Sequence, residues 1–188
     1  MNARQELDLL QQAQQKHDEQ HHRDIFYLSY PQRMAHLVFH FAKYSGRLAE
    51  LQKGADNKRF EATLIDTLIV ALSAANIFNI KLSETVLSED LSQYDSLDEV
   101  AQIICDVDAP SSASSSEWFF QRLAQATGRM AKACESLDHM EEFNYRRELT
   151  EGILEIIRGV IVAGERAGID LTDSTRRRWQ QIETRFVL

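Results

Sequence analysis

The chain contains the stretch Ala42-Lys43-Tyr44-Ser45-Gly46-Arg47-Leu48-Ala49-Glu50, which returns 82 positions later as Ala124-Gln125-Ala126-Thr127-Gly128-Arg129-Met130-Ala131-Lys132. A repeated segment indicates a duplicated structural unit. Each copy precedes a strongly apolar segment with one acid near its start, Asp66 in the first half and Glu155 in the second. These acids are offset by 89 positions, so the connection inside the second unit is longer by 7 residues. We therefore predict a duplicated helical hairpin.

The spacing of apolar residues favours helices throughout the chain. Only two prolines and seven glycines interrupt it, and apolar residues recur at steps of three and four, the period of an α-helix. We predict an all-α fold in which two helix pairs form a four-helix-bundle core surrounded by peripheral helices. The helices are expected over residues 3–22, 33–52, 59–78, 118–137, 146–167 and 174–186, with two shorter ones between 83 and 108.

The domain organisation follows from the repeat and from one low-complexity stretch. Residues 1–22 read as a polar N-terminal helix, solvated or frayed, with a narrow apolar edge. A first helical unit spans 23–108, a serine-rich linker spans 109–116 and a second unit spans 117–188. We expect both units to pack as one domain, which makes a pseudo-dimer within the chain. Formation of a homodimer is an open alternative.

Composition excludes several classes of function. A net charge of −8 disfavours binding to nucleic acid and to anionic membranes, because phosphate groups repel an acidic protein. The longest apolar run, 64–80, is interrupted by polar residues, so we expect no membrane span. Cys105 and Cys134 fit neither a disulfide framework nor a zinc-binding spacing, and no signal segment is recognised. These observations predict a cytoplasmic, reduced protein.

Polar residues of the first repeated helix fall on one face beside the apolar stripe. They are Arg33, His36, His40, Lys43, Arg47 and Glu50. Charged residues are usually exposed, so a solvated face is one interpretation. Binding of an anionic ligand is the other, and its candidate residues are His40, Lys43, Arg47 and, in the second copy, Arg129.

The two repeated arginines are candidates for ion pairs with the two acids of the apolar segments. We expect Arg47 to pair with Asp66 and Arg129 with Glu155, because a buried carboxylate needs a partner. The neighbouring Gly46 and Gly128 lack side chains, which favours a close helix approach there. A ligand site or ordinary exposure are the alternatives to structural pairing.

The histidines are weak candidates for metal ligands. His36 and His40 lie one helical turn apart, as do His17 and His21, with His22 alongside. A zinc site needs three or four ligands, and no third histidine or cysteine follows at a diagnostic spacing. We therefore predict no metal site.

The layout of both halves resembles the MazG-like all-α nucleoside triphosphate pyrophosphohydrolases, of the dimeric dUTPase and dCTPase type. The resemblance covers 23–83 and 118–172. It is carried by Arg23-Asp24, Pro31, Met34-Ala35, Gly46-Arg47-Leu48-Ala49-Glu50, and by Asp66 and Glu155, each 13 residues before Asn79 or Gly168. It implies a family whose acidic residues bind magnesium, which holds the triphosphate and activates water.

This chain departs from the family at most of the acidic positions. They read Lys43, Tyr44, Arg47 and Thr63 in the first half, and Gln125, Ala126, Arg129 and Gly152 in the second. Each half keeps about one of five carboxylates, and the cations that replace them repel a dication. The resemblance therefore implies a tandem, degenerate member.

Three functions remain open at this stage. The favoured hypothesis is a non-catalytic module that binds a nucleotide or another phosphate-bearing small molecule, or has a regulatory role, without a cofactor. The first alternative is an active magnesium-dependent pyrophosphohydrolase whose acids come from elsewhere. Its candidate residues are Asp66, Glu148, Glu151 and Glu155, with Glu50 and Glu61. The second alternative is a helical module that binds a protein partner.

Overall fold

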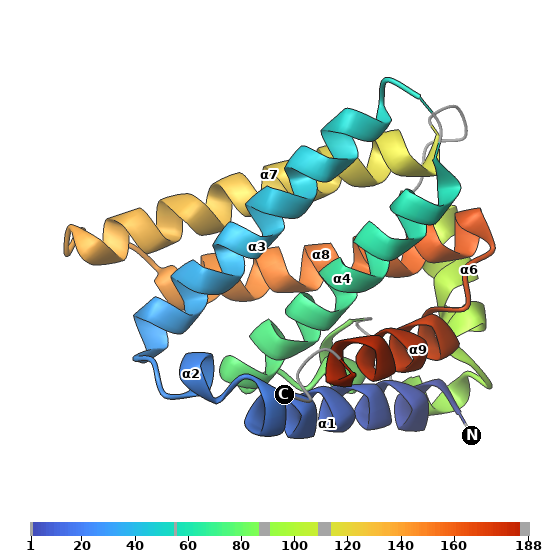
Figure 1. Ribbon diagram of the computed structural model, residues 1–188, viewed down its shortest axis with the longest axis horizontal. Helices are drawn as coiled ribbons and strands as arrows, with labels where there is room; N and C mark the ends of the chain where they lie inside the picture. Colours follow the sequence, from blue (N-terminus) through green and yellow to red (C-terminus); the bar gives the residue numbers. More distant parts are fainter. Residues whose placement is uncertain (1, 55, 87–90, 109–113, 185–188) are drawn as a thin grey trace.

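The computed structural model describes residues 2–54, 56–86, 91–108 and 114–184. Within these ranges the secondary structure is helical and contains no strand (Figure 1). The predicted all-α class is therefore confirmed. Residues 109–113 of the expected linker lie outside the described residues.

Four long helices form the core of the molecule. They are α3 (Tyr30–Leu51), α4 (Asn57–Ile77), α7 (Ser115–Asp138) and α8 (Tyr145–Ala167). Helix α3 packs against α4 and α7, and α8 packs against the same two helices, which closes a four-helix bundle. Figure 1 shows these helices as the upper part of the molecule. The duplication of the hairpin stays a prediction from the sequence.

A second group of helices lies below this core in Figure 1. Helix α1 (Ala3–His21) packs against α4, and α9 (Leu171–Glu183) contacts both α4 and α1. The remaining elements are α2 (Arg23–Phe26), α5 (Leu82–Thr85), η1 (Leu91–Gln93) and α6 (Leu97–Asp108).

The expectation of a solvated or frayed N-terminal helix is wrong. Helix α1 buries Ala3, Leu7, Leu10, Gln14 and His17. The apolar edge of α1 is narrow, but it is wide enough to pack against α4. The buried polar side chains Gln14 and His17 widen this contact. Asn2 adds a capping box that holds the first turn.

Capping residues explain where the helices begin and end. Pro31 lies in the first turn of α3, as predicted, and Gly168 ends α8 with a positive φ of 65°. Two expected boundaries are wrong. Ser114 caps α7, so the end of the expected linker is helical. Asp170 caps α9 in place of Thr172 or Ser174, because its carboxylate accepts from the amide of Asp173 at 2.8 Å.

The close helix approach does not occur at the repeated glycines. A methyl group at Gly46 or Gly128 would meet no atom within 4 Å, because both positions face outward. The tight contacts are at Gly152, where an added Cβ would lie 2.5 Å from Cγ of Met130, and at Gly164, next to Leu171. The two repeated glycines are therefore not the points at which the helices pack most closely.

Helix α4 is the most apolar helix of the bundle. Its length and composition would allow it to cross a membrane, but 78% of its most apolar 18-residue stretch is buried inside the protein. A core helix of a folded domain meets the same criterion, and α4 has that place here, between α3, α8, α1 and α9.

Candidate functional site

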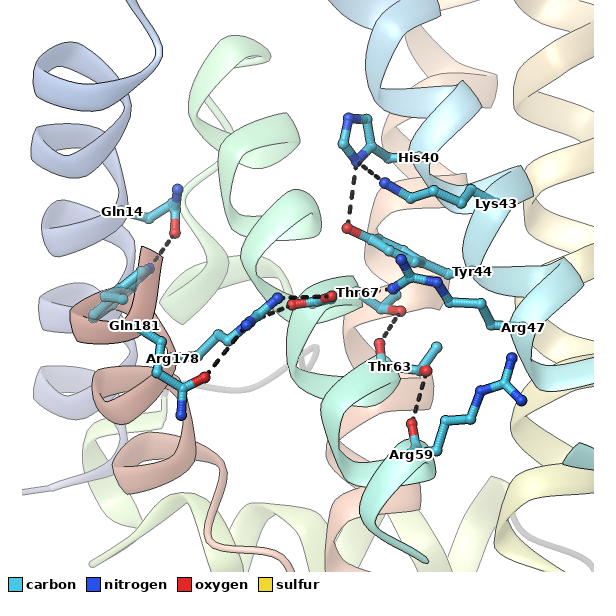
Figure 2. A network of polar contacts seen from close by, with 12 residues as sticks. Gln14, His40, Lys43, Tyr44, Arg47, Arg59, Thr63, Thr67, Arg178 and Gln181 are labelled. Atoms are coloured by element: carbon cyan, nitrogen blue, oxygen red, sulfur yellow. Dashed lines mark hydrogen bonds and ion pairs between the residues drawn. The ribbon is translucent and has the colours of Figure 1, made fainter. Parts of the chain in front are cut away.

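Asp66 lies in the middle of α4 and is only 9% exposed. A buried carboxylate needs partners that replace its hydration. Arg47 on α3 places Nη1 3.3 Å from Oδ2 of Asp66. Arg178 on α9 donates from Nε to Oδ1 at 2.7 Å and from Nη2 to Oδ2 at 3.3 Å (Figure 2). The carboxylate therefore links three helices, and its bond to Arg178 has the forked geometry of strong pairs.

Arg178 is a partner that the sequence analysis does not identify. It belongs to a run of three arginines and lies 112 positions from Asp66. Its direction depends on the register of α9, which the cap at Asp170 determines. The only hint next to Arg178 in the sequence is Trp179, which is buried. Consecutive residues of a helix point about 100° apart, so Arg178 lies at the border of the buried face of α9.

Lys43 adds a third cation to the same region. Its Nζ donates to Nδ1 of His40 at 3.0 Å and lies 4.7 Å from the centre of the Tyr44 ring. The guanidinium of Arg47 lies 5.3 Å from the same ring. Among the described residues no carboxylate forms an ion pair with Lys43, and its side chain is exposed. We call Lys43, Arg47, Asp66 and Arg178 the Asp66 cluster.

Burial, and then the neighbouring charges, shift the pKa values of the groups around this cluster. Burial and then the Arg47 charge lower the pKa of Lys43. Burial, Lys43 and His36 lower the pKa of His40 to about 4, so this imidazole is neutral at pH 7 and accepts the Lys43 proton donor. Burial and then Asp66 raise the pKa of Tyr44, whose hydroxyl oxygen lies 3.3 Å from Nδ1 of His40.

The neutral His40 predicts a loss of stability in acid. The unfolded chain binds a proton near pH 6.5, whereas the folded chain does so only near pH 4. Between these values the unfolded state holds more protons, so the free energy of unfolding decreases as the pH falls. Urea unfolding at steps from pH 7 to pH 4 should show this slope, and His40→Leu should make it shallower. An unchanged slope in the variant would contradict this origin.

The second half of the chain contains the simpler pair. Arg129 on α7 forms an ion pair with Glu155 on α8, and their side chains are 42% and 40% exposed. The position that corresponds to Lys43 is Gln125, which is exposed and uncharged. Arg129 and Glu155 are therefore a charge-balanced pair on the surface, without the excess of cations around Asp66.

The acids of the hydrolase alternative are occupied by arginines. Arg147 lies 2.9 Å from Glu148 and 3.8 Å from Glu151, and Arg59 pairs with Glu50. Glu61 accepts from Ser174 at 3.1 Å and lies 3.9 Å from Arg177. In the described part of the chain, none of these acids belongs to a group of three with metal-binding geometry.

The chain matches no family model, no curated protein and no solved structure. The likeness to the MazG-like hydrolases therefore stays a prediction, carried by the residues quoted from the sequence. The function of the protein is therefore inferred below from the geometry of the Asp66 cluster and of the residues around it.

A pocket lies next to the cluster, between α1, α2, α3 and α4, and His40 lines it. Its volume is about 100 Å³, and most of its walls are apolar. Arg33 also lines this pocket, and its Nε is buried without a hydrogen-bond partner among the described residues. Buried donors normally have partners, so this guanidinium can still bind an acceptor.

Within the described ranges of the chain, two groups of side chains have ligand atoms close enough to hold a metal ion. They are His17 with His21 and Glu183, and His17 with Asp18 and His22. Both lie at the end of α1, and neither contains a residue of the Asp66 cluster. The spacing of the histidines is visible in the sequence, whereas Glu183 comes from α9 and is not part of that pattern.

Proposed function

We propose that the protein is a non-catalytic module that binds a phosphate-bearing small molecule, of the nucleotide class, at the Asp66 cluster. The observation that carries this proposal is the charge of the cluster. Three cations, Lys43, Arg47 and Arg178, gather around one carboxylate in a chain whose net charge is −8. An acidic protein that concentrates cations at one point attracts anions there.

The geometry suits an anion that arrives from the side of Lys43. Lys43 is exposed and has no carboxylate partner among the described residues, so its ammonium is available. Arg47 uses Nη1 for Asp66, and its side chain is 41% exposed, which leaves further N–H donors for a ligand. Asp66 holds both arginines in place, and this preorganisation lowers the entropy cost of binding.

The adjacent pocket favours an anion with a small apolar part. Its volume of about 100 Å³ is below the range of about 300–1,000 Å³ that is typical of ligand pockets. Phosphate groups must therefore provide most of the recognition. Arg33 lines the pocket and brings a positive charge to it, next to the neutral imidazole of His40.

The same charges argue against magnesium-dependent hydrolysis. Magnesium binds through carboxylates and substrate phosphates, and cations at the site oppose a dication. The acids nearest in sequence to the expected catalytic positions are paired with arginines. We therefore propose a MazG-like module that has kept the helical frame and lost the metal.

Binding can be tested with a pair of matched variants. Isothermal titration with nucleoside triphosphates, pyrophosphate and inorganic phosphate, without metal, should show binding that weakens with added salt. Lys43→Gln, which introduces the residue of the second copy, should lower the affinity by about 10- to 150-fold, since a charge-assisted bond contributes about 1.5–3 kcal/mol. Arg129→Gln removes the same charge from the surface pair and should leave the affinity unchanged.

Three outcomes would contradict the proposal. Equal affinity of the Lys43→Gln variant and the unmodified protein would show that the cluster is not the site. Release of pyrophosphate in the presence of magnesium, abolished by Asp66→Asn or Glu148→Gln, would favour the hydrolase. The absence of binding to every phosphate compound would favour a protein partner.

A further inference from the structure

His17 is a buried side chain without hydrogen bonds. It is 5% exposed, on the face of α1 that points into the protein. Neither ring nitrogen, Nδ1 nor Nε2, has a partner among the described residues. A buried polar group without a partner is unfavourable and uncommon in folded proteins, so such an arrangement suggests a missing ligand.

Two possible metal ligands surround this imidazole. His21 follows one helical turn later, with ring centres 4.8 Å apart, and Glu183 comes from the last residue of α9. One ligand atom from each of the three side chains lies within 4.8 Å of the others. In the described part of the chain, His21 and Glu183 have no hydrogen bond or ion pair that would occupy them.

We propose that His17, His21 and Glu183 bind a divalent transition metal ion such as Zn²⁺. Two imidazoles and one carboxylate are a set that zinc accepts, and water takes the fourth, open position. Ligand atoms about 2.0–2.2 Å from a tetrahedral ion lie about 3.3–3.6 Å apart. The ligand atoms, which lie within 4.8 Å of one another, therefore need to close by up to about 1.5 Å, which the exposed side chain of Glu183 allows.

The second group of candidate ligands is less suited to the ion. Asp18 already accepts hydrogen bonds on both oxygens, from Gln14 at 2.7 Å and from Ser73 at 2.6 Å. A metal at His17, Asp18 and His22 would have to displace or share these bonds. Glu183 imposes no such cost, so the site joins the last turn of α1 to the last turn of α9.

The other histidine pair of the chain provides a matched control. His36 and His40 have the same spacing on α3, and their Nε2 atoms lie 3.2 Å apart. Among the described residues no third ligand completes that pair. The comparison therefore isolates the contribution of Glu183 and of the buried imidazole.

The test uses the full chain, treated with a chelator and then titrated with zinc. At zinc concentrations about 100-fold above Kd, the melting temperature should rise by about 5–10 °C. His21→Ala and Glu183→Ala, both at positions that are not buried, should abolish the rise, as should His17→Leu. The double variant His36→Ala/His40→Ala should keep it, and magnesium should produce none. Cobalt should give the visible absorption of a tetrahedral complex, lost in the same variants.

Three results would overturn the assignment. The first is the absence of both the thermal shift and the cobalt spectrum. The second is a shift that survives Glu183→Ala but disappears in Asp18→Asn or His22→Ala. The third is a shift that depends on His36 and His40. Lys43→Gln should leave the zinc response intact, so failure of the anion proposal and failure of the metal site are distinguishable.

Discussion

Replacing Asp66 by alanine is expected to destabilise the protein by about 3 kcal/mol, because removal of one partner from a buried ion pair leaves the other uncompensated. Here two guanidinium groups, of Arg47 and Arg178, lose their shared carboxylate. Lys43 also loses the attraction of Asp66, while the repulsion between Lys43 and Arg47 stays. The change also removes the ion pairs by which Asp66 joins α4 to α3 and to α9.

The matched control is Glu155→Ala in the second half of the chain. Its pair with Arg129 is about 40% exposed on both sides, and exposed pairs contribute only about 0–1 kcal/mol. Urea unfolding of the two variants should therefore give midpoints that differ clearly. Equal midpoints would mean that burial of Asp66 has no energetic consequence.

The sequence contains enough information to predict one half of the Asp66 cluster. Asp66 interrupts an apolar run, and Arg47 follows the repeated helix face, so the pair can be inferred from patterns within two neighbouring helices. Arg178 cannot be inferred in this way. A helical pattern shows which side of α9 is apolar, but not which other helix that side will meet.

The same reasoning explains the errors on the periphery. Helix α1 has a low share of apolar residues, and only its docking beside α4 shows that a narrow edge is sufficient. Gly46 and Gly128 are conspicuous in the repeat, yet packing depends on interhelical distance, which brings Gly152 against Met130. A sequence repeat indicates a shared helical pattern, whereas the positions of tight contacts depend on how the helices are arranged in space.

The candidate metal ligands show the limit of spacing rules. His17 and His21 have the separation of ligands on one helix face, but two ligands do not make a site. The third, Glu183, is one of many acids in the sequence, and nothing in its local pattern distinguishes it. Only the placement of α9 on α1 brings its carboxylate to the imidazoles.

Trp179 holds α9 in this position, and its replacement by alanine should destabilise the protein by about 3–5 kcal/mol. The ring is 8% exposed and stacks on His17 with centres 6.3 Å apart. Its Nε1 donates to Oε1 of Gln14 at 2.7 Å, and Gln14 in turn donates to Asp18. Loss of Trp179 therefore opens a cavity and leaves a buried acceptor unsatisfied.

The effect of Trp179→Ala should be local before it is global, because α9 contacts only α4 and α1 extensively. Hydrogen exchange should show reduced protection in α9 at temperatures where the four-helix bundle remains folded. The zinc response should also disappear, since Glu183 lies on the same helix. Trp179→Phe keeps most of the apolar contact and should cost only about 1–3 kcal/mol, the penalty for the unsatisfied Gln14.

The other tryptophan separates this role from a general loss of stability. Trp118 is 6% exposed and lies on α7, within the bundle. Trp118→Ala should lower the unfolding midpoint by a similar amount, yet leave both the protection of α9 and the zinc response in place. If both variants lose the zinc response equally at temperatures where they are folded, the packing of Trp179 on α9 is not what specifically positions Arg178 and Glu183. If only Trp179→Ala loses it, the packing of one aromatic ring positions a residue of each candidate site.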